Sequence, residues 1–187
     1  MRWLPFAGVL TMLALVFVRR PWLQRRSYGA AFAVALFALL LAQSLVSALA
    51  PESLPLAQAD RRAAATLRHA LGALLMLAGL ALLVTAQLQL GASWRIGVDE
   101  TARPGLLTSG VYALSRNPIF LALLVFVAGY MLLIPTLLSA VLLAGSYLGT
   151  RLQIAAEEAY FVRTYGDRYR AYARRVGRLV PGIGKLA

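Results

Sequence analysis

Two segments of the sequence place ionisable and polar side chains directly beside long apolar runs. One of them, residues 151–158, follows an uncharged run and contains Arg151, Glu157 and Glu158. If one helix continues through it, 3.6-residue spacing aligns Tyr147, Arg151 and Glu158 on one stripe. Charge-assisted hydrogen bonds from Arg151 to a carboxylate, and from an ammonium group to Glu158, would then hold an amino-acid moiety. A salt bridge at the end of the helix is the competing interpretation.

The other segment runs from residue 93 to residue 118 and contains Trp94 and Arg95 near its start. Gly110 gives the backbone freedom to approach a ligand. Pro118 suits the first turn of a helix, where free N–H groups bind anions such as a carboxylate or a phosphate. Turn formation at Gly110 and helix capping by Asn117 explain the same residues without any ligand.

Composition excludes several kinds of chemistry. The chain has no cysteine and a single histidine, His69, which excludes thiolate metal sites, a cysteine nucleophile and a zinc site built by this chain alone. The net charge of +12 comes from basic residues that flank apolar runs, and no nucleic-acid-binding motif is present. We therefore expect no metal and no nucleic acid partner, and membrane lipids with anionic headgroups as the counter-charge.

Hydropathy predicts the elements that must position these groups. The 187 residues are 60% hydrophobic, the mean hydropathy is +0.72, and the charges gather between long uncharged runs. The sequence predicts an all-α integral membrane protein with about five transmembrane helices, at residues 3–18, 28–49, 69–90, 117–132 and 136–153. The last two should form a tight helical hairpin, because Pro135 cannot continue a helix.

The distribution of basic residues predicts the orientation. Placing the N-terminus outside leaves 15 of the 19 lysines and arginines on the cytoplasmic side, together with the C-terminus. Arg19 and Arg20 follow the first apolar run where a cleavage site would need small residues, so we expect that helix to be retained. Residues 156–176 interleave tyrosine with arginine, which predicts an interfacial amphipathic helix that anchors the chain to the membrane surface.

Several short motifs are more informative in their order than singly. Residues 107–112 read Leu-Thr-Ser-Gly-Val-Tyr and residues 115–118 read Ser-Arg-Asn-Pro. Then come Glu157, Glu158, Tyr165, Gly166, Tyr169, Tyr172, Val176, Arg178 and Pro181. This series resembles the isoprenylcysteine carboxyl methyltransferase family, its bacterial members and the related phospholipid N-methyltransferases. The resemblance covers about residues 91–182, whereas the earlier spans match only in being hydrophobic.

The resemblance implies a methyltransferase (EC 2.1.1) that binds S-adenosylmethionine in a cytoplasm-facing pocket and takes a lipophilic acceptor from the bilayer. Residues 1–90 would be a scaffold of three helices and residues 91–187 the cofactor-binding region. Gaps between the third and fourth spans would admit the acceptor sideways. The predicted catalytic residues are Arg151 and Glu158, and Trp94 and Arg95 are predicted to bind the substrate. The predicted cofactor-binding residues are Leu107, Gly110, Tyr112, Asn117, Pro118, Tyr147, Glu157 and Glu158.

Alternatives remain at this point. Eukaryotic members usually carry histidine where this chain has Asn117; asparagine cannot titrate, so a proton-transfer role at that position is in doubt. The acceptor could be the carboxylate of a prenylcysteine-like or other small lipophilic molecule, which needs no base. It could also be an amine, as in a phospholipid, or a phenol, for which Glu157, Glu158 or a tyrosine would take the proton. NADPH-dependent sterol reductases look similar in this region, but they usually carry Asn-Tyr-x-Gly-Glu where Ile-Phe-Leu-Ala follows Pro118 here. In a non-enzymatic membrane component all the motifs would be turns and caps. The arginine-rich, lysine-poor composition hints at a prokaryotic gene, and hence at a bacterial inner membrane.

Overall fold

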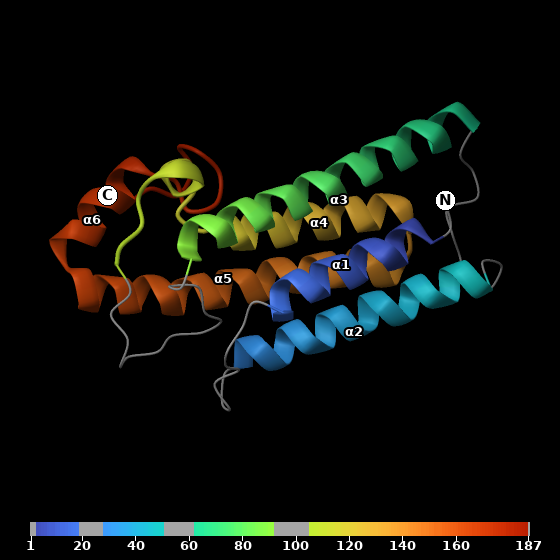
Figure 1. The fold of residues 1–187 in the computed structure, drawn as a ribbon, viewed down its shortest axis with the longest axis horizontal. Coiled ribbons are helices and arrows are strands. Elements are labelled where there is room, and N and C mark those ends of the chain that lie inside the picture. The colour runs from blue at the N-terminus through green and yellow to red at the C-terminus, as the bar shows by residue number, and fades with distance from the viewer. Residues whose placement is uncertain (1–2, 19–27, 51–61, 92–104, 187) are drawn as a thin grey trace.

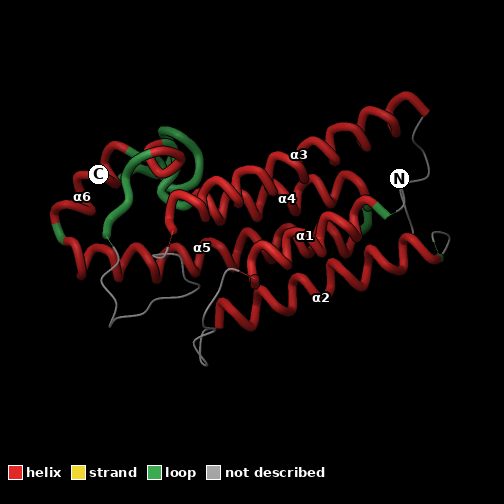
Figure 2. The backbone as a smooth tube through the Cα atoms, in the orientation of Figure 1, coloured by secondary structure: helices red, strands yellow, loops and turns green. Residues whose placement is uncertain are grey.

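The computed structural model describes residues 3–18, 28–50, 62–91 and 105–186, and this part of the chain is almost entirely helical. Its α-helices are α1 (Leu4–Val18), α2 (Tyr28–Leu49), α3 (Arg62–Leu90), α4 (Pro118–Leu133), α5 (Leu137–Tyr165) and α6 (Asp167–Arg175), with a short 3-10 helix η3 (Gly110–Ala113) before α4. Helices α1 to α5 lie side by side in an elongated bundle (Figure 1). The described loops gather mainly at the end that carries η3 and α6 (Figure 2).

Five helices of the bundle are apolar, as the sequence predicts. Two of them, α3 and α5, are long and apolar enough to cross a membrane, and α1, α2 and α4 contribute shorter apolar helices. The 29 residues of α5 extend about 43 Å, which exceeds the roughly 30 Å of a bilayer core. The last turns of α5 therefore protrude beyond the hydrocarbon, at the same end of the bundle as η3 and α6 (Figure 1).

Small residues bring the backbones of α3 and α4 into close contact. A Cβ atom added at Gly79 would lie 2.8 Å from the carbonyl oxygen of Ala122, and one at Gly129 would lie 2.6 Å from that of Gly72. Such contacts are typical of membrane helices, which associate by tight packing because lipid gives no hydrophobic drive. The predicted gaps between these two spans are absent over this stretch, so an apolar acceptor cannot pass between α3 and α4 there.

The predicted hairpin between the last two spans is confirmed. Helix α4 ends at Leu133, α5 begins at Leu137, and the Thr136 side chain caps α5 by accepting a hydrogen bond from the Ser139 amide at 3.1 Å. Gln43 of α2 donates to the hydroxyls of Thr136 (2.5 Å) and Ser139 (3.0 Å), and Tyr130 donates to the Leu40 carbonyl at 3.0 Å. These buried polar contacts fix α2 to the hairpin at the end of the bundle away from α6.

The chain between residues 156 and 176 differs from the prediction of one interfacial helix. Helix α5 continues unbroken to Tyr165, the backbone reverses at Gly166 with φ +52°, and only α6 is a separate amphipathic helix. Two tyrosines of α6, Tyr169 and Tyr172, are 2% and 3% exposed and pack with Phe161 against the end of α5. Their predicted role as membrane anchors is wrong, because the protein itself covers both rings.

Candidate functional site

Three segments far apart in the sequence meet at the end of the bundle that carries α6. They are residues 105–118, the C-terminal turns of α5, and α6 with the segment that follows it (Figure 1). Ser115 forms a parallel β-bridge with Gly177, and the Arg116 amide donates to the Gly177 carbonyl at 3.0 Å. The start of α4 is thereby fastened to the C-terminal segment.

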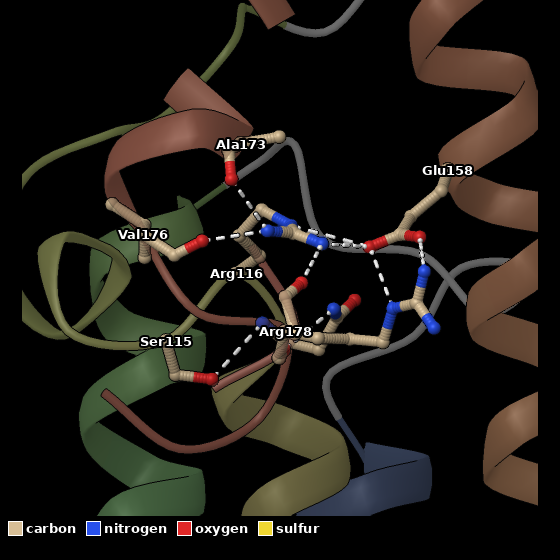
Figure 3. A network of polar contacts seen from close by, with 8 residues as sticks. Ser115, Arg116, Glu158, Ala173, Val176 and Arg178 are labelled. Atoms are coloured by element: carbon tan, nitrogen blue, oxygen red, sulfur yellow. Dashed lines mark hydrogen bonds and ion pairs between the residues drawn. The ribbon is translucent and has the colours of Figure 1, made fainter. Parts of the chain in front are cut away.

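Arg116 is the centre of this junction. Its side chain is 1% exposed, and all five of its N–H groups are used. Nη1 donates to the carbonyls of Ala173 (2.9 Å) and Val176 (2.6 Å), Nη2 donates to Glu158 Oε1 (2.6 Å) and the Gly184 carbonyl (3.1 Å), and Nε donates to Glu158 Oε1 (3.2 Å) (Figure 3). One guanidinium thus ties the start of α4 to α5, α6 and the C-terminal segment.

Glu158 is shared between two arginines. Besides Arg116, it accepts from Arg178 Nε at 3.2 Å and from Arg178 Nη2 at 2.7 Å (Figure 3). Its side chain is 11% exposed and that of Arg178 is 32% exposed. Two cations and one anion leave this network with a net charge of +1, and Nη1 of Arg178 has no hydrogen-bond partner within the described chain. The network therefore favours an additional anion beside Arg178.

The predicted pair of Arg151 and Glu158 is not brought together. Arg151 instead donates from Nη1 to the Tyr147 hydroxyl at 3.1 Å, and its guanidinium lies 5.9 Å from the centroid of the same ring. Arg151 and Tyr147 are exposed, whereas Glu158 is buried in its own network. The shared stripe on α5 is real, but α6 and the C-terminal segment cover only its Glu158 end.

Glu157 lies on another face of α5, as its spacing predicts. It is half-buried, accepts a hydrogen bond on Oε1 from Gln153 Nε2 at 3.0 Å, and has no partner for Oε2 within the described chain. Its charge acts on Tyr112, whose pKa is raised by burial first and then by the neighbouring Tyr172 and Glu157. Glu157 is thus a carboxylate with unused bonding capacity close to η3.

The 3-10 helix η3 is fixed by contacts from α3 and α6. Gln89 Oε1 accepts from the Val111 amide at 2.9 Å, and a Cβ at Gly110 would lie 2.3 Å from that same oxygen. Tyr172 donates to the Tyr112 carbonyl at 2.6 Å, and burial raises the pKa of Tyr172 to about 12. Gly110 is therefore favoured by its φ of +59°, whereas the Gln89 side chain could shift away from a Cβ. The phenols of Tyr112 and Tyr172 are neutral at physiological pH.

Asn117 and Pro118 lie at the start of α4, and the sequence predicts only one of their two roles there. Pro118 occupies the first helical turn, as predicted, but the Asn117 side chain makes no capping hydrogen bond. Its Nδ2 donates to the Arg178 carbonyl at 2.9 Å. Both residues are buried, and the Asn117 amide joins the start of α4 to the C-terminal segment.

Other predicted residues are less informative. Leu107 is half-buried in the segment before η3. Trp94 and Arg95, the predicted substrate-binding residues, lie outside the described residues. Sequence reasoning gave no role to Arg116 and Arg178, although both belong to the motif series. A cation placed directly before an apolar span, at Arg116, is the signal that points to a buried partner.

A family model described as phospholipid methyltransferase matches residues 67–168, which extend from α3 through α5 to the start of α6. The match covers more than half of the chain. The chain belongs to the phospholipid methyltransferase family. It is therefore a membrane methyltransferase, and the reductase alternative is not favoured. Among the curated proteins, none matches the chain. The part shared with the phospholipid methyltransferase family includes Arg116 and Glu158, whereas Arg178 lies beyond it.

Proposed function

We propose that the chain transfers a methyl group from S-adenosylmethionine to a lipid acceptor at the end of the bundle that carries α6. One observation carries the proposal: the segment matched by the phospholipid methyltransferase family contains the helices whose ends converge there. The family's description favours a phospholipid over a prenylcysteine-like carboxylate as the acceptor. The non-enzymatic alternative explains the turns and caps but not the family match.

The unused bonding groups at this end fit the cofactor. S-adenosylmethionine, when bound, supplies an electrophilic methyl group on a sulfonium centre, next to an amino-acid ammonium and carboxylate. Burial raises the pKa of Glu157 to about 7, and an ammonium group beside Oε2 would favour its charged form. Glu157 thus offers a negative partner for the ammonium, and Arg178 Nη1 offers a cation for the carboxylate. The hydroxyl of Tyr165 is buried without any hydrogen-bond partner in the described chain, which is unusual unless a ligand or water supplies one.

We assign the chain's residues three tasks in the reaction. Glu157 and Arg178 bind and orient the cofactor, and positioning of this kind supplies much of the rate in a displacement reaction. The Arg116–Glu158–Arg178 network holds the wall of the site in place. Tyr112 and Tyr172 remain neutral, because burial raises the pKa of both phenols, so they donate hydrogen bonds and take no proton from the acceptor.

The site also suggests a position in the cell. We assign it to the cytoplasmic face, because S-adenosylmethionine is a polar cytoplasmic metabolite and because arginines gather at this end. Arg163, Arg168, Arg170, Arg174, Arg175 and Arg178 all belong to the last turns of α5, to α6 or to the following segment. A bacterial inner membrane suits the arginine-rich composition.

Titration calorimetry with S-adenosylhomocysteine tests the cofactor assignment on purified, folded protein. Binding is expected, and Glu157→Gln should weaken it about ten-fold or more, because a charged partner is lost. Asp167→Asn is the matched control, since Asp167 is a carboxylate at the same end that is 93% exposed and pairs with Arg170. A folded sample that binds no S-adenosylhomocysteine would refute the proposal. Mass spectrometry of lipids after incubation with methyl-labelled S-adenosylmethionine then identifies the acceptor.

A further inference from the structure

An apolar groove with a volume of about 610 Å³ lies between α4 and α5. Its lining residues are Leu124, Val125, Ala128, Met131, Ala140, Leu143, Ala144 and Tyr147. Three of these eight are alanines, so the hollow exists where small side chains on the two helices face each other. Tyr147 alone brings a polar side-chain atom, and among the lining residues of α5 it lies nearest to the end of the bundle that carries the candidate site.

A cation marks that end of the groove. Arg151 follows Tyr147 by one helical turn, bonds its hydroxyl at 3.1 Å and stays exposed. No carboxylate in the described part of the chain pairs with it. From Ala140 to Arg151 the helix rises about 16 Å, roughly half of a hydrocarbon core. The groove and its cation therefore match the depth of one lipid leaflet.

We propose that this groove binds a glycerophospholipid, with an acyl chain against Ala128 and Ala144 and the phosphodiester on Arg151. Two features favour this occupant. An exposed guanidinium forms charge-assisted hydrogen bonds with phosphate, and the rest of the lining matches a hydrocarbon chain. The proposal rests on the proposed function, because it makes this lipid the methyl acceptor on its way from the bilayer to the site.

The route is consistent with the rest of the bundle. Helices α3 and α4 are closed to an acyl chain where Gly72 and Gly79 bring their backbones together. Glu157 lies six residues beyond Arg151 on α5, about 9 Å further along the helix axis. A lipid whose phosphate sits at Arg151 thus presents its headgroup towards the end of the bundle that carries the cofactor residues, although Glu157 itself lies on another face of α5.

Photo-cross-linking tests the groove directly. The probe is a phosphatidylethanolamine with a diazirine in one acyl chain, mixed with the purified full chain in lipid nanodiscs, and mass spectrometry maps the labelled residues. Cross-links should concentrate in residues 124–131 and 140–147. Ala144→Phe, which fills the groove, should lower this labelling at least ten-fold. Ala78→Phe is the matched control, because Ala78 is an exposed alanine on α3 and the same ring there should leave the labelling unchanged.

A second set of measurements tests whether Arg151 binds the phosphate of the headgroup. Arg151→Gln should weaken competition by unlabelled phosphatidylethanolamine about ten-fold, and diacylglycerol of the same chain length should compete poorly, because it has no phosphate. Equal competition by diacylglycerol would overturn the phosphate assignment, and labelling spread evenly over all lipid-facing helices would overturn the groove. Titration of the same samples with S-adenosylhomocysteine reports on the cofactor site separately. Absent cofactor binding with intact groove labelling would count against the proposed function, and retained cofactor binding with dispersed labelling would count against the groove.

Discussion

Replacing Glu158 by glutamine should release the C-terminal segment from the bundle. The substitution keeps the size of the side chain but removes the negative charge that pairs with Arg116, whose side chain is 1% exposed. Breaking a buried ion pair in this way costs about 3–5 kcal/mol. We take the lower end, about 3 kcal/mol, because Arg116 keeps three carbonyl acceptors and glutamine still accepts one hydrogen bond. The contribution of Arg178 is small, since it is 32% exposed and partly solvated.

The consequence is a more frequent opening of α6 and the segment behind it. About 3 kcal/mol corresponds to a roughly 100-fold larger population of the open form. Limited digestion with trypsin measures it, because cleavage after Arg174 and Arg175 requires that α6 unfold locally. Mass spectrometry follows the fragment that ends at these residues. Asp167→Asn, which breaks an exposed ion pair with Arg170, should change this rate less than about five-fold. Equal effects of the two variants would refute the reasoning.

Three further predictions concern packing, protonation and orientation. Gly79→Leu should lower the unfolding temperature sharply, since even a Cβ there meets the Ala122 carbonyl at 2.8 Å, whereas Gly145→Ala meets nothing within 4 Å and should leave it unchanged or slightly higher. Circular dichroism in detergent measures both. Because the pKa of Tyr172 is raised in the folded protein, its contribution to stability is complete below pH 10.0 and is lost as the pH rises towards about 12. Tyr172→Phe should reduce this loss of stability, which circular dichroism also measures. The chain has no cysteine, so Lys185→Cys should react with an impermeant maleimide only after cells are opened, and Ala64→Cys without opening; the reverse pattern would contradict the orientation.

The sequence predicts the bundle well, because a helix that contacts lipid must be apolar along its length. Each segment of the sequence shows this property by itself, without knowledge of the other segments. The five apolar helices and the hairpin at Pro135 therefore agree with the structure. Residues 156–165 are helical, as the sequence predicts, but they extend α5 instead of belonging to a separate surface helix, because polarity rises there while helix formation continues. The reversal at Gly166 depends on a positive φ, which the tyrosine and arginine pattern does not signal.

The candidate site is less accessible to sequence reasoning. Helical spacing reports neighbours on one helix, and it placed Tyr147 and Arg151 together, as observed. It cannot report that Arg116 reaches Glu158, 42 residues away, since that contact depends on how α4 and α5 pack against α6. Arg178 is harder still, because it follows the last helix and its position is set by the turn that brings residue 183 back to it.

The hydrogen bonds of Gln43 limit how far the chain can be shortened. The family match begins at residue 67, which invites the view that α3 to α6 form a self-sufficient catalytic unit. Yet Gln43 of α2 satisfies Thr136 and Ser139 at the head of the hairpin, and the Leu40 carbonyl satisfies Tyr130. A chain without α2 would turn these groups towards hydrocarbon, where each unmet polar group costs several kcal/mol. A transplanted catalytic half therefore needs a substitute for α2, either a second membrane helix that carries an amide at the same depth or apolar replacements at all three positions.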